Sequence, residues 1–467
     1  MTRRELLRAS FTLPLSVAIR GQSDASGAAE TVLSRIKPPS FPARDFDITR
    51  FGATPGGQAI CTDAIRKAIA ACSAAGGGRV LIPRGSFLTG AIHLESNINL
   101  HVSDGAVLLF SRDPKDCLPL VYTRFEGTEC MNYSPFIYAF QKENIAVTGP
   151  GLLDGQADAE HWWPWARKAR GGARGMQRAA DSDVETLVRK MGDHDVPVGN
   201  RVFGEGHYLR PNFVQPYRCN NVLLEGFTMK NSPMWELNPV LCRNVTVRNV
   251  NIDSHGPNND GCDPESSRDV LISGCSFSTG DDCIAIKSGR NRDGRRVNVP
   301  CENVIVRDCT MKDGHGGVSI GSEVSGGIRN IFVDACRMSS PNLQRALRIK
   351  TNSYRGGVIE GIHFTSVTVG QVAQAVIEVD FYYEEGEGGP FRPVVKDIFV
   401  GDVTCQKSKY GIYLRGYAQD PITGVDLANC TFDNAAQGDF FQNVSAVKAK
   451  NVKVNGKLVT AKDLESV

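Results

Sequence analysis

A short strand signal recurs through the second half of this chain and constrains its fold more than any other feature. A Val or Ile, in most copies directly after Asn or Asp, returns every 22 to 36 residues, at Val222, Val245, Val270, Val304, Ile331, Ile362, Ile398, Val425 and Val447. A minimum spacing near 22 residues with variable additions is expected of a coiled solenoid, because each turn stacks its strands on the previous turn while its loops vary in length. One coil cannot bury its apolar face alone, so the repeat predicts a single long core.

Other all-β architectures fit the repeat less well. A β-sandwich or a propeller also has many short strands, but a propeller blade needs about 40–50 residues. Residues 64–75 have helical apolar spacing, with Thr62 or Asp63 as a possible N-cap and three glycines at 76–78 as a stop. This is the only substantial helix that the sequence predicts, and it would cover an open sheet edge. We therefore expect an all-β fold, a single-stranded right-handed parallel β-helix with an N-terminal capping helix.

The N-terminus has the composition of an export signal. Arg3 and Arg4 precede a mildly apolar run over residues 9–19 and a small, polar segment, which is typical of a twin-arginine (Tat) signal, although an ordinary leader with two adjacent arginines would read the same. The apolar run is too short to span a bilayer. We expect residues 1–30 to be a Tat-like signal and leader, 31–45 a linker and 46–467 one β-helix domain, with the mature protein periplasmic or secreted and outside the membrane.

Charge and cysteine content exclude several other functions. The chain has 53 Lys and Arg against 51 Asp and Glu, a net charge of +2, which gives no general attraction to nucleic acid. None of the 14 cysteines has the Cys-x-x-Cys spacing of a zinc site. They stand beside apolar strand residues, so we expect most of them to be small buried hydrophobes with reduced thiols. We expect no metal, no cofactor and a monomer.

Two pairs of carboxylates lie near the middle of the chain. Asp260 and Asp263 form the first pair, and Asp281 and Asp282 form the second, ahead of an apolar run that predicts a strand. Asn, Asp and Gly favour turns, so each pair taken alone could be structural. In a solenoid the coil period becomes a distance, because adjacent strands lie about 4.8 Å apart. Steps of 22, 33 and 33 residues therefore predict one row across four adjacent coils, formed by Asp260, Asp282, His315 and Arg348.

This row would suit the hydrolysis of a glycoside whose sugar carries a carboxylate. Such hydrolysis uses one carboxyl group as acid and another as base, and crowded aspartates repel one another, which raises a pKa. Arg348 and Lys350 are two residues apart on a predicted strand and so share a face, where they could bind a substrate carboxylate. Taken separately, His315 could be a turn residue and the two cations a solvated strand face.

Four motifs in this order resemble the signature of the polygalacturonases, glycoside hydrolase family 28: Asn258-Asn259-Asp260, Gly280-Asp281-Asp282, Gly314-His315-Gly316 and Arg348-Ile349-Lys350. Residues 149–156, Trp162-Trp163 and Arg210-Pro211 add to the likeness, which covers about residues 45–435. One position departs from the pattern, because the family's first motif usually has Thr where this chain has Asn259. We expect a local change of hydrogen bonding there and no change of mechanism.

The resemblance implies a metal-free, inverting hydrolase of galacturonic acid glycosides, acting on a pectic polysaccharide or an oligogalacturonide. Asp281 would be the general acid, Asp260 and Asp282 would activate the attacking water, and His315 would support the acid. The residues expected to bind the substrate are Arg348, Lys350, Asn258, Tyr382 and Tyr383. Inversion needs room for a water molecule, so the acid and base carboxyl groups should lie about 6.5–9.5 Å apart.

Two segments favour action at chain ends. Residues 165–180 hold five basic residues and no acid, and form either a solvated loop or a wall of the cleft that attracts pectin. Tyr382 and Tyr383 could stack on a sugar ring. Together with the likeness of this loop and of residues 353–357 to bacterial exo-acting members, these features favour an exo-galacturonosidase. The alternatives are a rhamnogalacturonan galacturonohydrolase of the same family, a pectate lyase and a non-catalytic pectin-binding β-helix.

Overall fold

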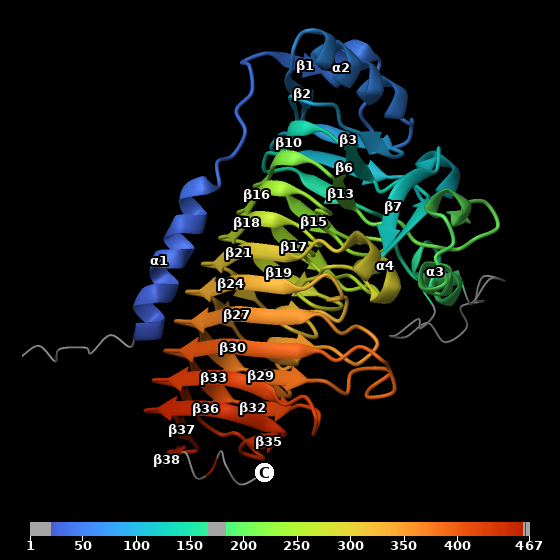
Figure 1. Ribbon diagram of the computed structural model, residues 1–467. Helices are drawn as coiled ribbons and strands as arrows, with labels where there is room; N and C mark the ends of the chain where they lie inside the picture. Colours follow the sequence, from blue (N-terminus) through green and yellow to red (C-terminus); the bar gives the residue numbers. More distant parts are fainter. Residues whose placement is uncertain (1–19, 167–183, 461–462, 464–467) are drawn as a thin grey trace, which may run out of the picture.

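The chain winds into a right-handed parallel β-helix, which confirms the predicted fold (Figure 1). The computed structural model describes residues 20–166, 184–460 and 463. Successive coils stack along one axis, and their strands line up into three long sheets in which almost all neighbours pair in parallel. Because each coil repeats the same path, residues far apart in sequence become neighbours on adjacent coils.

The strands of the three sheets follow one another in chain order. The first sheet consists of β1 (Asp45–Asp47), β2 (Gly78–Ile82), β5 (Ile98–Val102), β10 (Glu143–Thr148), β14 (Asn220–Glu225), β16 (Arg243–Arg248), β18 (Arg268–Ser273), β21 (Cys301–Arg307), β24 (Ile328–Asp334), β27 (Val358–Thr365), β30 (Val394–Gly401), β33 (Ile422–Ala428) and β36 (Val444–Lys450). The second consists of β3 (Gly85–Thr89), β6 (Ala106–Phe110), β11 (Leu152–Asp154), β15 (Thr228–Lys230), β17 (Asn251–Ser254), β19 (Ser276–Thr279), β22 (Thr310–Met311), β25 (Arg337–Met338), β28 (Thr368–Gln371), β31 (Thr404–Lys407), β34 (Thr431–Phe432), β37 (Lys453–Val454) and β38 (Lys457–Leu458). The third consists of β4 (Ile92–His93), β9 (Ile137–Phe140) and β13 (Val214–Tyr217), then β20 (Ile284–Ile286), β23 (Val318–Ile320), β26 (Arg345–Lys350), β29 (Ala375–Asp380), β32 (Tyr410–Arg415) and β35 (Phe440–Gln442). A small side sheet consists of β7 (Val121–Phe125), β8 (Thr128–Asn132) and β12 (Val202–Phe203).

The repeat found in the sequence is the register of the first sheet. Each of its nine Val or Ile residues pairs with the next, from Val222 opposite Val245 to Val425 opposite Val447. The residue before each one has a positive φ between 53° and 68°. Asn, Asp and Gly tolerate this left-handed conformation better than other residues, which explains why they fill most of these positions.

The part of the chain that the structure describes has four α-helices outside the coils: α1 (Arg20–Arg35), α2 (Thr62–Ala74), α3 (Val184–Asp193) and α4 (Asn291–Val297). There are also short 3-10 helices at Ile48–Phe51, Pro114–Cys117, Trp163–Trp165 and Val198–Asn200. The capping helix is confirmed as α2, but neither Thr62 nor Asp63 is its N-cap, because the helix begins at Thr62 after Cys61. The expectation of only one substantial helix is wrong.

Helix α1 changes the interpretation of the N-terminal region. It runs beside the first sheet (Figure 1), and Val32 of the helix and Ile36, directly after it, pack on Ile305 and Phe332 of that sheet. Arg35 donates a 2.9 Å hydrogen bond to the buried carboxylate of Asp269. The predicted linker over residues 31–45 therefore begins inside a docked helix. Its composition was misleading because Ser and Gly do not prevent a helix that gains tertiary contacts. The Tat-like residues 1–19 lie outside the described part.

The core is continuous along the solenoid and includes the cysteines. All 14 cysteines are buried and free, as expected for small apolar residues in stacked strands. Within the described residues, no helix combines the length and apolar character needed to span a membrane.

Candidate active site

A cleft of about 340 Å³ lies beside the turns that lead from the second sheet into the third. Its lining includes residues from four successive coils and from three outer segments: Glu126, Glu185, Arg189, His255, Gly256, Pro257, Asn258, Gly280, Asp281, His315, Gln344, Arg345, Arg348, Tyr383 and Glu384. Most of these side chains are polar or charged. The four sequence motifs therefore meet at one surface.

The expected row of residues is only partly straight. Cys262 bridges to Ile284, so Asp260 and Asp282 stand at equivalent places on neighbouring coils, as predicted. The next steps differ, because Ile284 pairs with Val318 and Arg348 pairs with Ser319 rather than with the position of His315. The loops of these coils differ in length, and equal spacing in sequence does not give an equal register. The side chains of His315 and Arg348 still reach the aspartates.

Three carboxylates form the centre of the site. One oxygen from each of Asp260, Asp281 and Asp282 lies within 4.8 Å of the other two. These nearest-oxygen distances are shorter than the 6.5–9.5 Å between carboxyl groups that inversion led us to expect. Asp282 is fully buried, whereas the side chain of Asp281 keeps 20% of its surface exposed. Asp281 is thus the carboxylate that a substrate in the cleft can reach.

Asp282 is held as an anion by two cations. Nζ of Lys350 donates a 2.7 Å hydrogen bond to Oδ2, and Nη1 of Arg348 lies 3.6 Å from Oδ1. Burial raises the pKa of Asp282, but the charges of Lys350 and Arg348 outweigh it and hold that pKa well below its usual value. Arg348 lines the cleft, as predicted for a substrate-binding residue. Lys350 is engaged with Asp282 behind it.

Asp260 and Asp263 share a cation that sequence reasoning did not assign. Nζ of Lys287 lies 3.6 Å from a carboxylate oxygen of each aspartate and 3.2 Å from Glu323. Asp263 is fully buried and does not line the cleft. Burial, followed by the charges of Asp263 and Asp281, raises the pKa of Asp260 well above its usual value. The predicted repulsion between like charges is present, and the carboxyl group whose pKa it raises is that of Asp260.

His315 contacts the proposed acid directly. Its Nδ1 lies 2.8 Å from Oδ1 of Asp281. Burial raises the pKa of Asp281, but the hydrogen bond and charge of His315 bring it below the usual value. If Asp281 is the general acid, another group must therefore raise its pKa so that the carboxyl group is protonated when the substrate is bound.

In the first motif, Asn259 has a structural role and Asn258 faces the cleft. Asn259 is fully buried; its amide donates to the carbonyls of Ser232 and Met234, and its Oδ1 accepts from Ser254 and from the backbone N–H of Gly256. This Asn therefore braces the turn that carries Asp260. Asn258 lines the cleft, and its Oδ1 accepts a 2.8 Å hydrogen bond from Arg210.

The two tyrosines separate. Tyr383 lines the cleft, with the cations of Arg348 and Lys350 at 5.4 and 5.3 Å from its ring centre. Tyr382 packs instead on Tyr417 and Arg415, outside the cleft lining. The structure therefore places only Tyr383 of the two predicted residues at the cleft, because the backbone turns between them and directs their rings apart.

Several lining residues come from segments that sequence reasoning left without a role. Arg189 and Glu185 lie on α3, and Glu126 lies in the turn of the β7–β8 hairpin, where it pairs with Arg189. Such residues have no motif and no coil spacing, so only their position in the fold identifies them. The basic residues predicted to form a wall, between 167 and 178, lie outside the described part.

Comparisons with known proteins point to one family. The profile described as "Glycosyl hydrolases family 28" matches residues 203–456, more than half of the chain. The crystal structure of a hyperthermoactive exopolygalacturonase from Thermotoga maritima matches with a TM-score of 0.89 and 43% identity, covering 93% of this chain and 97% of that one. An exo-poly-alpha-D-galacturonosidase from Dickeya chrysanthemi is 25% identical, over 89% of this chain and 75% of its own length. An endo-polygalacturonase from Pectobacterium carotovorum subsp. carotovorum is 29% identical, over 77% of this chain and 81% of its own. The chain therefore belongs to glycosyl hydrolases family 28.

Proposed function

We propose that this chain is an exo-acting polygalacturonase that removes galacturonate from chain ends by inverting hydrolysis. The observation that carries the proposal is the arrangement of three clustered aspartates, one of them reachable, in a cleft lined by guanidinium groups and narrowed by outer segments. Relatives of both the endo and the exo type match the sequence. The 43% identity to an exopolygalacturonase and the shape of the cleft favour the exo type.

The cations of the cleft fit a uronate carboxylate. Arg345 and Arg189 have close carboxylate partners, Glu378 and Glu126 respectively. Arg348 is held more loosely, at 3.6 Å from both Asp282 and Glu378. A guanidinium without a tight partner can still form a paired hydrogen bond with a carboxylate. Arg348 is therefore the group that binds the sugar acid next to the cleaved bond.

The uronate also prepares the acid. Its negative charge and the water that it displaces both raise the pKa of a nearby carboxyl group. Both effects act on Asp281 and oppose that of His315. Asp281 then protonates the leaving glycosidic oxygen, while His315 keeps its carboxyl group oriented.

The attacking water fits between Asp260 and Asp282. Oδ1 of each is buried and accepts no hydrogen bond from the described residues. One carboxylate oxygen of each aspartate lies within 4.8 Å of an oxygen of the other, a separation at which one water molecule can donate a hydrogen bond of about 2.8 Å to both groups. The ionised Asp282 is suited to take the water's proton, and attack from this side inverts the anomeric centre.

Outer segments narrow the cleft and support exo action. Helix α3 contributes Glu185 and Arg189, and the loop after β29 contributes Tyr383 and Glu384. That loop is fastened, because Arg290 and Arg355 form ion pairs with Glu384 and Glu385. A loop held in place beside the cleft leaves room for the end of a polysaccharide chain more readily than for its middle, which would have to pass through the cleft on both sides.

The test is the product profile on polygalacturonate over time, followed by chromatography and viscosity, for the parent protein and for Asp281→Asn. We expect monomeric galacturonate from the first time point, a slow fall in viscosity, and a rate about 10²–10⁴-fold lower in the variant. Asp426→Asn, an exposed aspartate on β33 far along the solenoid, is the matched control and should hydrolyse like the parent. Mixed oligomers from the start would contradict exo action.

Other outcomes would move the assignment. Galacturonate released only from rhamnogalacturonan fragments would keep the chemistry and change the substrate. An unsaturated product that is lost with a chelator would indicate a lyase, and binding without any release would indicate a pectin-binding β-helix. We also propose export through the twin-arginine signal and a monomeric mature protein, which fractionation of cells and light scattering would test.

A further inference from the structure

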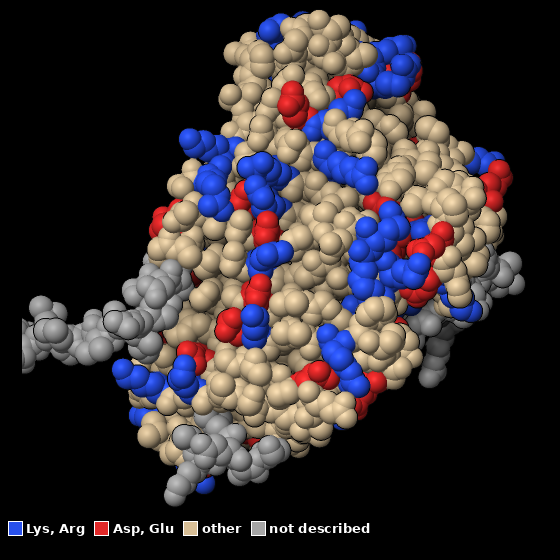
Figure 2. All heavy atoms as spheres, viewed as in Figure 1, with Lys and Arg blue, Asp and Glu red and all other residues tan. Residues whose placement is uncertain are grey.

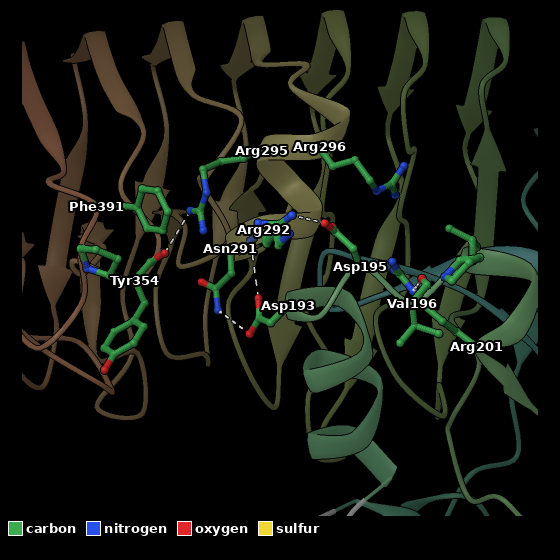
Figure 3. Close-up of a pocket in the computed structure, with 13 residues that line it drawn as sticks. Asp193, Asp195, Val196, Arg201, Asn291, Arg292, Arg295, Arg296, Tyr354 and Phe391 are labelled. Atoms are coloured by element: carbon green, nitrogen blue, oxygen red, sulfur yellow. Dashed lines mark hydrogen bonds and ion pairs between the residues drawn. The ribbon is translucent and has the colours of Figure 1, made fainter.

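A second groove, of about 890 Å³, lies next to the active-site cleft and shares none of its lining residues (Figure 3). Helix α3 takes part in both hollows: Glu185 and Arg189 line the cleft, whereas Asp193 at the helix end lines the groove. The rest of its walls comes from residues 195–198 and Arg201 after α3, from helix α4, and from Tyr354 and residues 390–391, just before β30. The groove is the larger of the two, and the proposed hydrolysis gives it no role.

Arginine side chains dominate the groove. Figure 2 shows Lys and Arg gathered over α4. In Figure 3, Arg295 extends from this helix toward Phe391 and Tyr354, Arg292 reaches Asp195, and Arg296 extends on the side of Arg201. Arg296 and Arg201 are tied to the buried Asp293. The carboxylate of Asp293 holds these two guanidinium groups in place and offsets part of their positive charge.

Two arginines remain available to a ligand. Among the described residues, Asp195 is the one carboxylate that forms an ion pair with Arg292, and both side chains are exposed, at 58% and 41%. An exposed ion pair contributes little and exchanges easily. Arg295 donates to the backbone carbonyls of Tyr354 and Arg355, and no carboxylate among the described residues forms an ion pair with it.

Aromatic rings lie beside these cations. Phe391 is 41% exposed and Tyr354 is 38% exposed. The guanidinium of Arg295 lies 3.5 Å from the ring centre of Phe391, so the ring fixes the cation in place. Exposed rings that adjoin cations with a weak carboxylate partner or none indicate a binding surface. The combination fits a ligand that has both apolar ring faces and carboxylates.

We propose that this groove is a second binding site for oligogalacturonate, in which Arg292 and Arg295 bind uronate carboxylates and Tyr354 and Phe391 contact sugar rings. The inference rests on the proposed function for its choice of ligand. An exo-acting cleft holds only the end of a polymer, so the rest of the chain must cross the adjacent surface. The groove retains that part and raises the local concentration of chain ends at the cleft.

The first experiment measures binding directly, by titration calorimetry, in the Asp281→Asn background with an oligogalacturonate of about ten residues. We expect Arg295→Ala and Phe391→Ala each to weaken binding by about tenfold, and added salt to weaken it further. Because Arg295 also supports backbone carbonyls, Arg292→Gln serves as a variant that disturbs only an exposed side chain. Arg392→Ala is the matched control, since its 43% exposed side chain follows Phe391 but lies outside the groove.

The second experiment compares substrates of different length with otherwise unmodified enzyme. In the groove variants KM for polygalacturonate should rise about tenfold, whereas kcat/KM for digalacturonate should stay unchanged, because a dimer fits inside the cleft. Equal effects on both substrates, or no effect on either binding or KM, would overturn the proposal. Self-association of the parent that Arg292→Gln abolishes would also overturn it and would make the groove a contact between copies of this chain.

Failure of the proposed function would look different. If the parent hydrolyses no galacturonide, the calorimetric result still decides whether the groove binds oligogalacturonate. A neutral polymer such as dextran should give no heat of binding in either case, since it offers no carboxylate to the two arginines.

Discussion

Replacing Lys350 by methionine should destabilise the folded protein most at neutral pH and least in acid. Nζ of Lys350 is 2.7 Å from Oδ2 of Asp282, and neither side chain is more than 7% exposed. The variant keeps a side chain of similar length but leaves a buried carboxylate with only Arg348, at 3.6 Å. Removing one partner of a buried ion pair costs about 3–5 kcal/mol in the free energy of unfolding.

The direction of the pH dependence follows from the pKa of Asp282. In the folded parent this pKa is below its unfolded value, so the carboxylate stabilises the fold above about pH 4 and loses that contribution as the pH falls toward the folded pKa. In the variant, burial raises the pKa and the contribution is absent. The difference between the two proteins therefore shrinks in acid. The acidic limb of the activity profile should also move to higher pH, because Asp282 must be ionised to act as a base.

Thermal unfolding by circular dichroism at pH 7 and pH 4 tests this reasoning. At about 2.1 cal/mol/K per residue, the 467 residues have an unfolding entropy of about 1 kcal/mol/K, so the Tm at pH 7 should fall by about 3–5 °C. Lys396→Met is the matched control, since this lysine pairs with Glu360 at 3.0 Å on an exposed strand position, and its Tm should stay close to that of the parent. An unchanged Tm for the Lys350 variant at pH 7 would refute the argument.

Three further changes test other parts of the structure. His315→Ala should raise the pKa of Asp281, because it removes a hydrogen bond that lowers that pKa. We expect kcat to fall and the alkaline limb of the kcat–pH profile to move to higher pH. A move to lower pH would contradict the assignment of Asp281 as the acid. Asn259→Thr should lower the free energy of unfolding by about 1–3 kcal/mol, because one hydroxyl cannot replace the four hydrogen bonds of a buried amide, and urea titration with activity assays should show the loss of stability without loss of the reaction. Val32→Asp should detach α1 from Ile305 and Phe332, which limited proteolysis would detect as faster cleavage near residue 32 with unchanged hydrolysis.

The sequence predicted the coil register well because that register follows a local rule. A left-handed residue followed by a buried Val or Ile can be read from neighbouring letters, and each copy pairs with the next in the first sheet. The same rule located Asp260 opposite Asp282 on the next coil. It failed for His315 and Arg348 because their coils have loops of unequal length. The resulting shift of register cannot be read from the number of residues between them.

Tertiary packing decided what lies outside the coils. Helix α1 exists where composition suggested a linker, because its apolar residues gain contacts with Ile305 and Phe332 that no local propensity reveals. Tyr382 and Tyr383 are adjacent in sequence, yet only Tyr383 faces the cleft, since the direction of a loop side chain depends on the backbone turn between the residues.

The sequence by itself determined the parallel β-helix, the family and the four motifs that meet at the cleft, because stacked coils turn sequence period into distance. Only the tertiary structure decided how charge is distributed among them. Lys350 keeps the carboxyl group of Asp282 ionised. Asp260 lies beside Asp263, and both are close to the cation of Lys287. His315 contacts the carboxyl group of Asp281. A pKa depends on burial and on charges within a few Å, and both arise only when separate coils and loops come together.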